Sequence, residues 1–182
     1  MSVMNIVKYG DPILRKKCQP VVDFSKLPSF VENMFDTMYE EEGIGLAANQ
    51  VGVDMNLFII DIAHTDDSEF PRIFVNGKIK KFNGECIFSE GCLSIPQVAL
   101  EVIRPEKITF KYQDMKEKWH EEEFDGLLAR AIQHEMDHLN GILTIDLVDE
   151  TQKAKVQKEV NEIKNDSISR IKQKSSNKRF VI

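Results

Sequence analysis

One pentapeptide, HEMDH at residues 134–138, constrains the fold more than any other feature of the sequence. It interrupts an apolar segment whose hydrophobic residues recur at the spacing of an α-helix, from a capping Asp125 to a stop at Asn140-Gly141. A helix with this much apolar surface is buried, and buried polar side chains are costly unless they have partners. The sequence therefore predicts a helix at the centre of the molecule whose polar residues bind something.

The spacing of the polar residues in this helix favours a metal ion. Residues four apart on an α-helix differ by about 40° in azimuth and about 6 Å along the axis, so His134 and His138 can reach one cation. Glu135 flanks the same point. Because a carboxylate beside a metal-bound water can take its proton near neutral pH, the pattern suits hydrolysis of amide bonds.

The identity of the third metal ligand decides the class of enzyme, since a catalytic zinc-type site uses three protein ligands. The extended pattern HExxHxxGxxH requires a histidine at position 144, where this chain has Thr144. Two alternatives remain open. A carboxylate of the last charged segment, Glu159 or Glu162, would give a zinc endopeptidase, and Cys92 would supply a soft thiolate.

Length and composition favour one globular domain with mixed secondary structure. The chain has 182 residues, of which 42% are hydrophobic and 30% charged, as in ordinary folded proteins. Apolar periodicity predicts two N-terminal helices, strands in the middle of the chain and a hairpin before the central helix. The expected ranges are helices near 11–15 and 27–42, strands within 55–61, 72–82, 107–112 and from 119, and an amphipathic helix over about 151–174.

The charge distribution divides the chain into two parts. Lys and Arg number 24 against 30 Asp and Glu, and the net charge of −6 argues against binding to DNA or to an anionic membrane. After Asp166 no acidic residue follows, while several basic ones do. We therefore expect a single catalytic domain at 1–166 and a basic, flexible C-terminal tail at 167–182.

Cysteine usage and the absence of targeting segments favour the cytoplasm. The three cysteines are an odd number in a chain large enough to fold without disulfides, so reduced thiols are expected. No run of about 18 apolar residues occurs, and the first ten residues lack the pattern of a signal peptide. We expect a cytoplasmic protein without a membrane-spanning segment.

Three segments together resemble the signature segments of peptide deformylases. They are GIGLAANQ at 43–50, EGCLS at 90–94 and QHEMDHLNG at 133–141, in the order and close to the separations found in that family. The likeness extends to YGDPILRKKCQPV at 9–21 and covers the chain from about residue 5 to about 165. The sequence is thereby identified as a member of this family.

The resemblance implies an α+β fold in which antiparallel or mixed strands surround the central HExxH helix, with N-terminal helices and a C-terminal amphipathic helix. It implies removal of the N-formyl group from the initiator methionine of nascent polypeptides, with release of formate. Cys92, His134 and His138 would hold one divalent ion, Fe²⁺ in the cell and Zn²⁺, Ni²⁺ or Co²⁺ in purified material. Hydroxamate-type metal-chelating inhibitors are expected to bind.

The resemblance also implies a role for each residue of the site. Glu135 acts as the general base, and the Gln50 amide and the Leu93 backbone N–H stabilise the oxyanion. Gly45 allows main-chain pairing with an extended peptide. The candidates for the pocket of the methionine side chain are Ile44, Phe88, Leu127 and Ala131.

The roles of Ala99, Arg130 and the basic tail do not follow from the signature segments. Many bacterial family members carry a basic residue where this chain has Ala99, which places a peptide contact in doubt. Arg130 either rims the pocket or faces solvent. The basic tail suggests weak docking to the ribosome. A metal-stabilised binding protein or an inactive relative is the non-enzymatic alternative.

Overall fold

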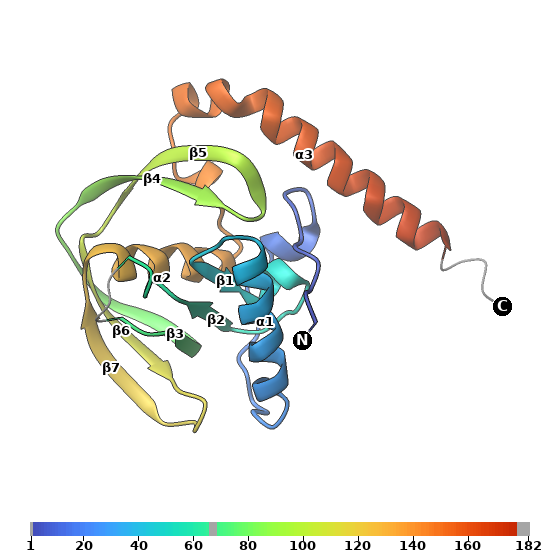
Figure 1. Ribbon diagram of the computed structural model, residues 1–182. Coiled ribbons are helices and arrows are strands. Elements are labelled where there is room, and N and C mark those ends of the chain that lie inside the picture. Colours follow the sequence, from blue (N-terminus) through green and yellow to red (C-terminus); the bar gives the residue numbers. More distant parts are fainter. Residues whose placement is uncertain (1, 66–68, 178–182) are drawn as a thin grey trace.

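The computed structural model describes the backbone of residues 2–65 and 69–177 (Figure 1). Within these ranges it contains three α-helices, seven strands and three short 3-10 helices. The helices are α1 (Leu27–Glu40), α2 (Gly126–Leu139) and α3 (Glu150–Asn177), and the 3-10 helices are Pro12–Arg15, Ala48–Val51 and Thr144–Asp146. The strands are β1 (Gly45–Ala47), β2 (Leu57–Ile60), β3 (Arg72–Asn83), β4 (Cys86–Cys92), β5 (Ile95–Arg104), β6 (Lys107–Gln113) and β7 (Trp119–Phe124).

The strands form two separate sheets, one on each side of α2. Five strands pair in the order β1-β2-β3-β6-β7, and β4 pairs with β5 as a two-stranded ribbon. All of these pairs are antiparallel. Figure 1 shows α2 lying between the five-stranded sheet and the ribbon. The expected α+β fold, with strands around a central helix, is confirmed.

Helix α2 is buried on the face that it turns to the five-stranded sheet. Its apolar residues, among them Leu128 and Ile132, belong to the same core cluster as Phe58, Phe74 and Phe110 of the strands. The helix begins where the sequence predicts, but the Asp125 side chain makes no capping hydrogen bond with any described residue. It pairs instead with Lys107 at 3.4 Å.

The two strands of the β4–β5 ribbon, like the short strand β1, lie outside the ranges predicted from the sequence. Buried and exposed residues alternate along β5, which packs with Val98, Leu100 and Val102 in a core cluster shared with Val160 of α3. Cys92 is the last residue of β4. The polar residues SEG at 89–91 hide this strand from a search for apolar alternation, because one of them, Glu90, is buried.

Helix α3 confirms the predicted amphipathic helix and continues beyond it. It runs without a break past residue 166, where we expect the catalytic domain to end, to Asn177. Ser167 is buried, and its hydroxyl donates to the Lys8 carbonyl at 3.2 Å. Residues 178–182 lie outside the described residues, so the flexible tail stays a prediction. Among the described helices, none has both the length and the apolar character needed to cross a membrane.

The N-terminal segment before the first 3-10 helix connects distant parts of the chain. The Val7 amide donates to the Gln50 carbonyl at 2.7 Å, and the Tyr9 amide donates to the Ser94 carbonyl at 2.9 Å. Lys8 Nζ donates to the Leu93 carbonyl at 2.9 Å. This segment therefore contacts both the 3-10 helix Ala48–Val51 and the turn between β4 and β5.

Candidate metal centre and active site

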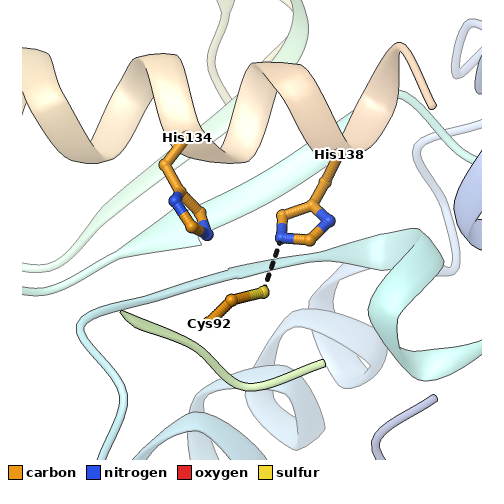
Figure 2. A group of neighbouring side chains, drawn as sticks. All are labelled: Cys92, His134 and His138. Atoms are coloured by element: carbon orange, nitrogen blue, oxygen red, sulfur yellow. Dashed lines mark hydrogen bonds between the residues drawn. The ribbon is translucent and has the colours of Figure 1, made fainter. Parts of the chain in front are cut away.

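Cys92, His134 and His138 converge on one point between β4 and α2. Their possible ligand atoms all lie within 4.8 Å of one another. Figure 2 shows both imidazole rings projecting from α2 toward the Cys92 side chain. The Cys92 Sγ atom lies 3.2 Å from His138 Nε2. The three residues proposed as metal ligands from the sequence are thus brought together.

The chemistry of this donor set fits a transition-metal ion. One sulfur and two imidazole nitrogens match the ligands of zinc, iron, nickel or cobalt rather than those of calcium or magnesium. Burial alone would raise the pKa of the Cys92 thiol, but His138 and His134 outweigh burial and lower it well below its ordinary value. The environment therefore favours the thiolate, which is the form that binds metals.

The alternative third ligands lie elsewhere. Glu159 and Glu162 are exposed on α3, on the outside of the molecule. Within the described ranges, the group of His, Cys, Asp and Glu residues whose ligand atoms converge is the one containing Cys92. The position of α3 therefore removes the basis for the endopeptidase alternative.

Glu135 is a buried carboxylate beside the metal cluster. Its residue is 4% exposed, and its Oε2 atom has no hydrogen-bond partner among the described residues. Burial raises the pKa of this carboxyl above its usual value. A buried oxygen without a partner is costly, so this atom is free to bind a water molecule or a substrate group. Gly45 adjoins the same carboxylate: a Cβ added there would lie 2.6 Å from Glu135 Oε1.

Gln50 approaches the cluster from the 3-10 helix Ala48–Val51, and Leu93 from the turn between β4 and β5. The side-chain Oε1 atom of Gln50 accepts a hydrogen bond from the Ala47 backbone amide at 2.8 Å, and this bond fixes the orientation of the side chain. Its Nε2 atom then lies 3.8 Å from Cys92 Sγ and 3.3 Å from Ser94 Oγ. Leu93 follows Cys92 directly and is held through its carbonyl by Lys8.

A cavity of about 620 Å³ opens in front of these residues. Its volume lies in the range of sites that bind small molecules and short peptides. Ten of the residues proposed from the sequence line it. They are Ile44, Gly45, Gln50, Phe88, Cys92, Leu93, Leu127, Ala131, His134 and Glu135. Ala99 is exposed on β5, opposite Gly91, and is not among the lining residues.

A second group of charged residues behind the site was missed by the sequence analysis. Glu90 is buried and accepts hydrogen bonds from Arg104, Arg130 and His134. Arg130 lines the cavity wall but is only 6% exposed, and its guanidinium turns inward to Glu90. Burial would raise the pKa of Glu90, yet its hydrogen bonds to His134 and Arg104 lower it to about 2. The position of Glu90 two residues before Cys92 was the available signal, because alternate residues of a strand share a face.

Comparison with known proteins finds the same architecture and sequence pattern. A family model described as polypeptide deformylase matches residues 3–154. A peptide deformylase of Chlorobaculum parvum is 42% identical over 166 residues, which cover 89% of this chain and 88% of the relative. The crystal structure of a peptide deformylase from Legionella pneumophila matches with a TM-score of 0.82 and 38% identity, covering 90% of this chain and 96% of that one. A Synechococcus elongatus peptide deformylase, solved in complex with actinonin, matches with a TM-score of 0.78 and 39% identity over 90% of this chain and 86% of that one.

Proposed function

This chain belongs to the polypeptide deformylase family, and from that membership we propose which of its residues carry out the reaction. The activity of the family is hydrolysis of the N-formyl group on the initiator methionine of nascent polypeptides, with release of formate. The convergence of one thiol, two imidazoles and a buried, unpartnered glutamate at a single cavity supports the same activity here.

The proposed metal ligands are Cys92, His134 and His138, and the proposed ion in the cell is Fe²⁺. The same ligands suit Zn²⁺, Ni²⁺ or Co²⁺ in purified material. When bound, the ion acts as a Lewis acid and lowers the pKa of water.

Glu135 is proposed as the general base and then the general acid. Its unpartnered Oε2 atom takes the proton of the attacking water, and the same oxygen returns a proton to the nitrogen of the leaving amine. The raised pKa of this buried carboxyl favours proton uptake. The Gln50 Nε2 group and the Leu93 backbone N–H donate to the oxygen that becomes negative as the formyl carbon turns tetrahedral.

The substrate is proposed to bind as an extended strand. β1 is an edge strand of the five-stranded sheet, and its first residue, Gly45, lines the cavity. Main-chain pairing with β1 would recognise the peptide backbone and tolerate many sequences after methionine. The proposed pocket for the methionine side chain consists of Ile44, Phe88, Leu127 and Ala131, which line the same cavity.

The test is formate release from a formyl-methionyl peptide by protein purified without oxygen, with bound metal measured on the same sample. We expect turnover at about one metal ion per chain. Because Glu135 moves protons but is not a ligand, Glu135→Ala should keep the metal and lose turnover by about 10²–10⁴-fold. Metal binding without formate release by the unmodified protein would contradict the proposal.

Three further assignments accompany this proposal. Hydroxamate-type chelators should inhibit by reaching the metal through the cavity. The cytosol is the proposed compartment, because a Cys92 thiolate ligand requires reducing conditions. The basic residues from Arg170 onward are proposed to contact ribosomal RNA weakly. Deleting 170–182 should reduce co-sedimentation with ribosomes at low salt, and an unchanged result would contradict the contact.

A further inference from the structure

The candidate metal ligands come from two elements, a strand of the β4–β5 ribbon and helix α2, that are not joined by sheet hydrogen bonds. Cys92 ends β4, whose strand partner is β5, whereas His134 and His138 lie on α2 (Figure 2). The sheet hydrogen bonds of the described strands therefore do not set the distance between the thiol and the imidazoles. A metal site needs its ligands held close to their final geometry. Other contacts must fix β4 on α2.

Glu90 of β4 and Arg104, the last residue of β5, provide such a contact. Arg104, on β5, donates from Nε and Nη2 to the two Glu90 oxygens at 2.6 and 2.9 Å. Its Nη1 atom donates to Asp137 Oδ2 on α2 at 2.6 Å. Asp137 directly precedes His138. One guanidinium thus binds a carboxylate of the ribbon and a carboxylate of the helix at the same time.

Arg130 crosses the same boundary from the opposite side. From α2 it donates to Glu90 Oε1 at 2.9 Å, to the Val102 carbonyl at 3.0 Å and to the Cys86 carbonyl at 2.8 Å. With two cations and two carboxylates, the group formed by Glu90, Arg104, Arg130 and Asp137 is balanced in charge. We name these four residues the Glu90 cluster. Hydrogen bonds from a planar guanidinium to carboxylates are directional, so the cluster fixes orientation as well as distance.

The Glu90 cluster also reaches one ligand directly. Glu90 Oε2 lies 2.9 Å from His134 Nδ1. A proton on Nδ1 leaves Nε2 with its lone pair toward Cys92, which is the form that an imidazole ligand needs. Glu90 is two residues from Cys92 on the same strand. It therefore links the thiol-bearing strand to a ligand imidazole.

We propose that Arg104 is a positioning residue of the metal centre, which holds β4 on α2 through Glu90 and Asp137 so that Cys92 meets both imidazoles before an ion binds. The inference rests on Cys92, His134 and His138 being the metal ligands. Arg104 touches neither the substrate cavity nor a ligand atom, so its effect is on the geometry and affinity of the site. The chemistry of Glu135 is not altered.

The experiment titrates metal-free protein with Zn²⁺ in competition with a chelator of known affinity. Arg104→Met keeps an unbranched apolar side chain but removes the guanidinium and with it both links, and we expect its zinc affinity to fall by about 10–100-fold. The absorption spectrum of the Co²⁺-loaded variant should shift as the cobalt–thiolate geometry changes. In the metal-free protein, amides of β4 should exchange hydrogen faster. Arg104→Lys should lie in between, because a single ammonium replaces the planar fork.

Arg72→Met is the matched control, because it removes the same charge from an arginine that pairs with Glu69 at 3.2 Å in the other sheet. Its zinc affinity should equal that of the unmodified protein. Equal zinc affinity and an unchanged cobalt spectrum in Arg104→Met would overturn the proposal, even if that variant melted at a lower temperature.

Two further variants, Asp137→Asn and Cys92→Ala, cover the cases in which Arg104→Met does not fold or the assigned ligands are wrong. If Arg104→Met does not fold, Asp137→Asn removes one charge of the helix-side link while the Arg104–Glu90 pair remains, and we expect a zinc affinity about tenfold lower. No loss in Asp137→Asn would then overturn the proposal. Cys92→Ala separates this inference from the metal assignment: full zinc affinity in that variant would overturn the assigned ligands, and the role of Arg104 with them.

Discussion

At the scale of single residues, the site depends on two buried glutamates in opposite electrostatic surroundings. Glu90 faces two guanidiniums and an imidazole, and its pKa falls to about 2, so it stays charged. Glu135 has an unpartnered oxygen, and burial raises its pKa. One carboxylate is suited to hold its neighbours in place and the other to exchange a proton. The division of roles follows from neighbours rather than from residue type.

Two glycine substitutions separate an effect on chemistry from an effect on packing. A Cβ at Gly45 would lie 2.6 Å from Glu135 Oε1, and a Cβ at Gly77 would lie 2.4 Å from the Phe110 ring. We expect Gly45→Ala to displace the carboxylate and lower kcat by about 100-fold. Gly77→Ala should mainly destabilise the core, by about 1–3 kcal/mol.

The measurements are steady-state deformylation and thermal melting of both variants with their metal content matched. If Gly45→Ala keeps full turnover, the carboxylate of Glu135 does not need the space that this glycine provides.

Site residues that are close together in the sequence could be predicted from it, whereas residues that meet only through the tertiary fold could not. His134, Glu135 and His138 share one helix, so their spacing alone predicts that they act together. Cys92 needed the family resemblance, because a lone cysteine in a polar segment is more often a small buried residue. Arg104 and Arg130 could not be assigned, since their meeting at Glu90 depends on how the ribbon folds over α2.

At the scale of elements, α2 performs different tasks on its two sides. Toward the five-stranded sheet it is mainly apolar and packs with the phenylalanine core, while Glu135 lies beside Gly45 of the edge strand β1. Toward the ribbon it carries His134, His138 and Asp137. Its length and position were predictable from periodicity. The ribbon could not be predicted in this way, because Glu90 is a buried charged residue at a position where the strand pattern requires an apolar one.

Neighbouring residues of α3 give a prediction for this element. Val160 is buried against the ribbon's core cluster, whereas Glu159 beside it is exposed. Val160→Ala should lower the free energy of unfolding by about 1–2 kcal/mol through lost apolar burial. Glu159→Ala should leave stability, metal content and turnover unchanged.

Thermal melting and metal analysis check both α3 variants. Loss of metal in Glu159→Ala would restore the carboxylate as third ligand, and an unchanged melting temperature in Val160→Ala would show that α3 does not stabilise the ribbon.

At the scale of the whole molecule, the metal site lies at the boundary between two layers. An ion bound by Cys92 and the two histidines would join the ribbon to α2 and, through α2, to the five-stranded sheet. A ligand that binds the folded state stabilises it according to its concentration relative to Kd. Metal binding should therefore increase the free energy of unfolding of the whole molecule as well as restore activity.

Zinc added to metal-free protein at about a hundred times its Kd should stabilise the fold by about 2.7 kcal/mol. For a chain of this size the melting temperature should rise by about 5–10 °C. Calorimetric melts across a zinc series, with Cys92→Ala as control, measure the effect. A similar rise in both proteins would show that the stabilising ion binds elsewhere.

The N-terminal segment has a consequence for the order in which the enzyme assembles. Lys8 bonds to Leu93, 85 residues later in the chain, and its carbonyl accepts from Ser167, 159 residues later. Contacts between such distant residues are slow to form, because long loops must close before the contact stabilises anything. The helix α2, by contrast, forms from local contacts. We therefore expect the helix that carries the two imidazoles to form early in folding. The loop that contains Leu93 should become ordered later, when the two ends of the chain come together. A partly folded chain should therefore be inactive even if α2 has already formed.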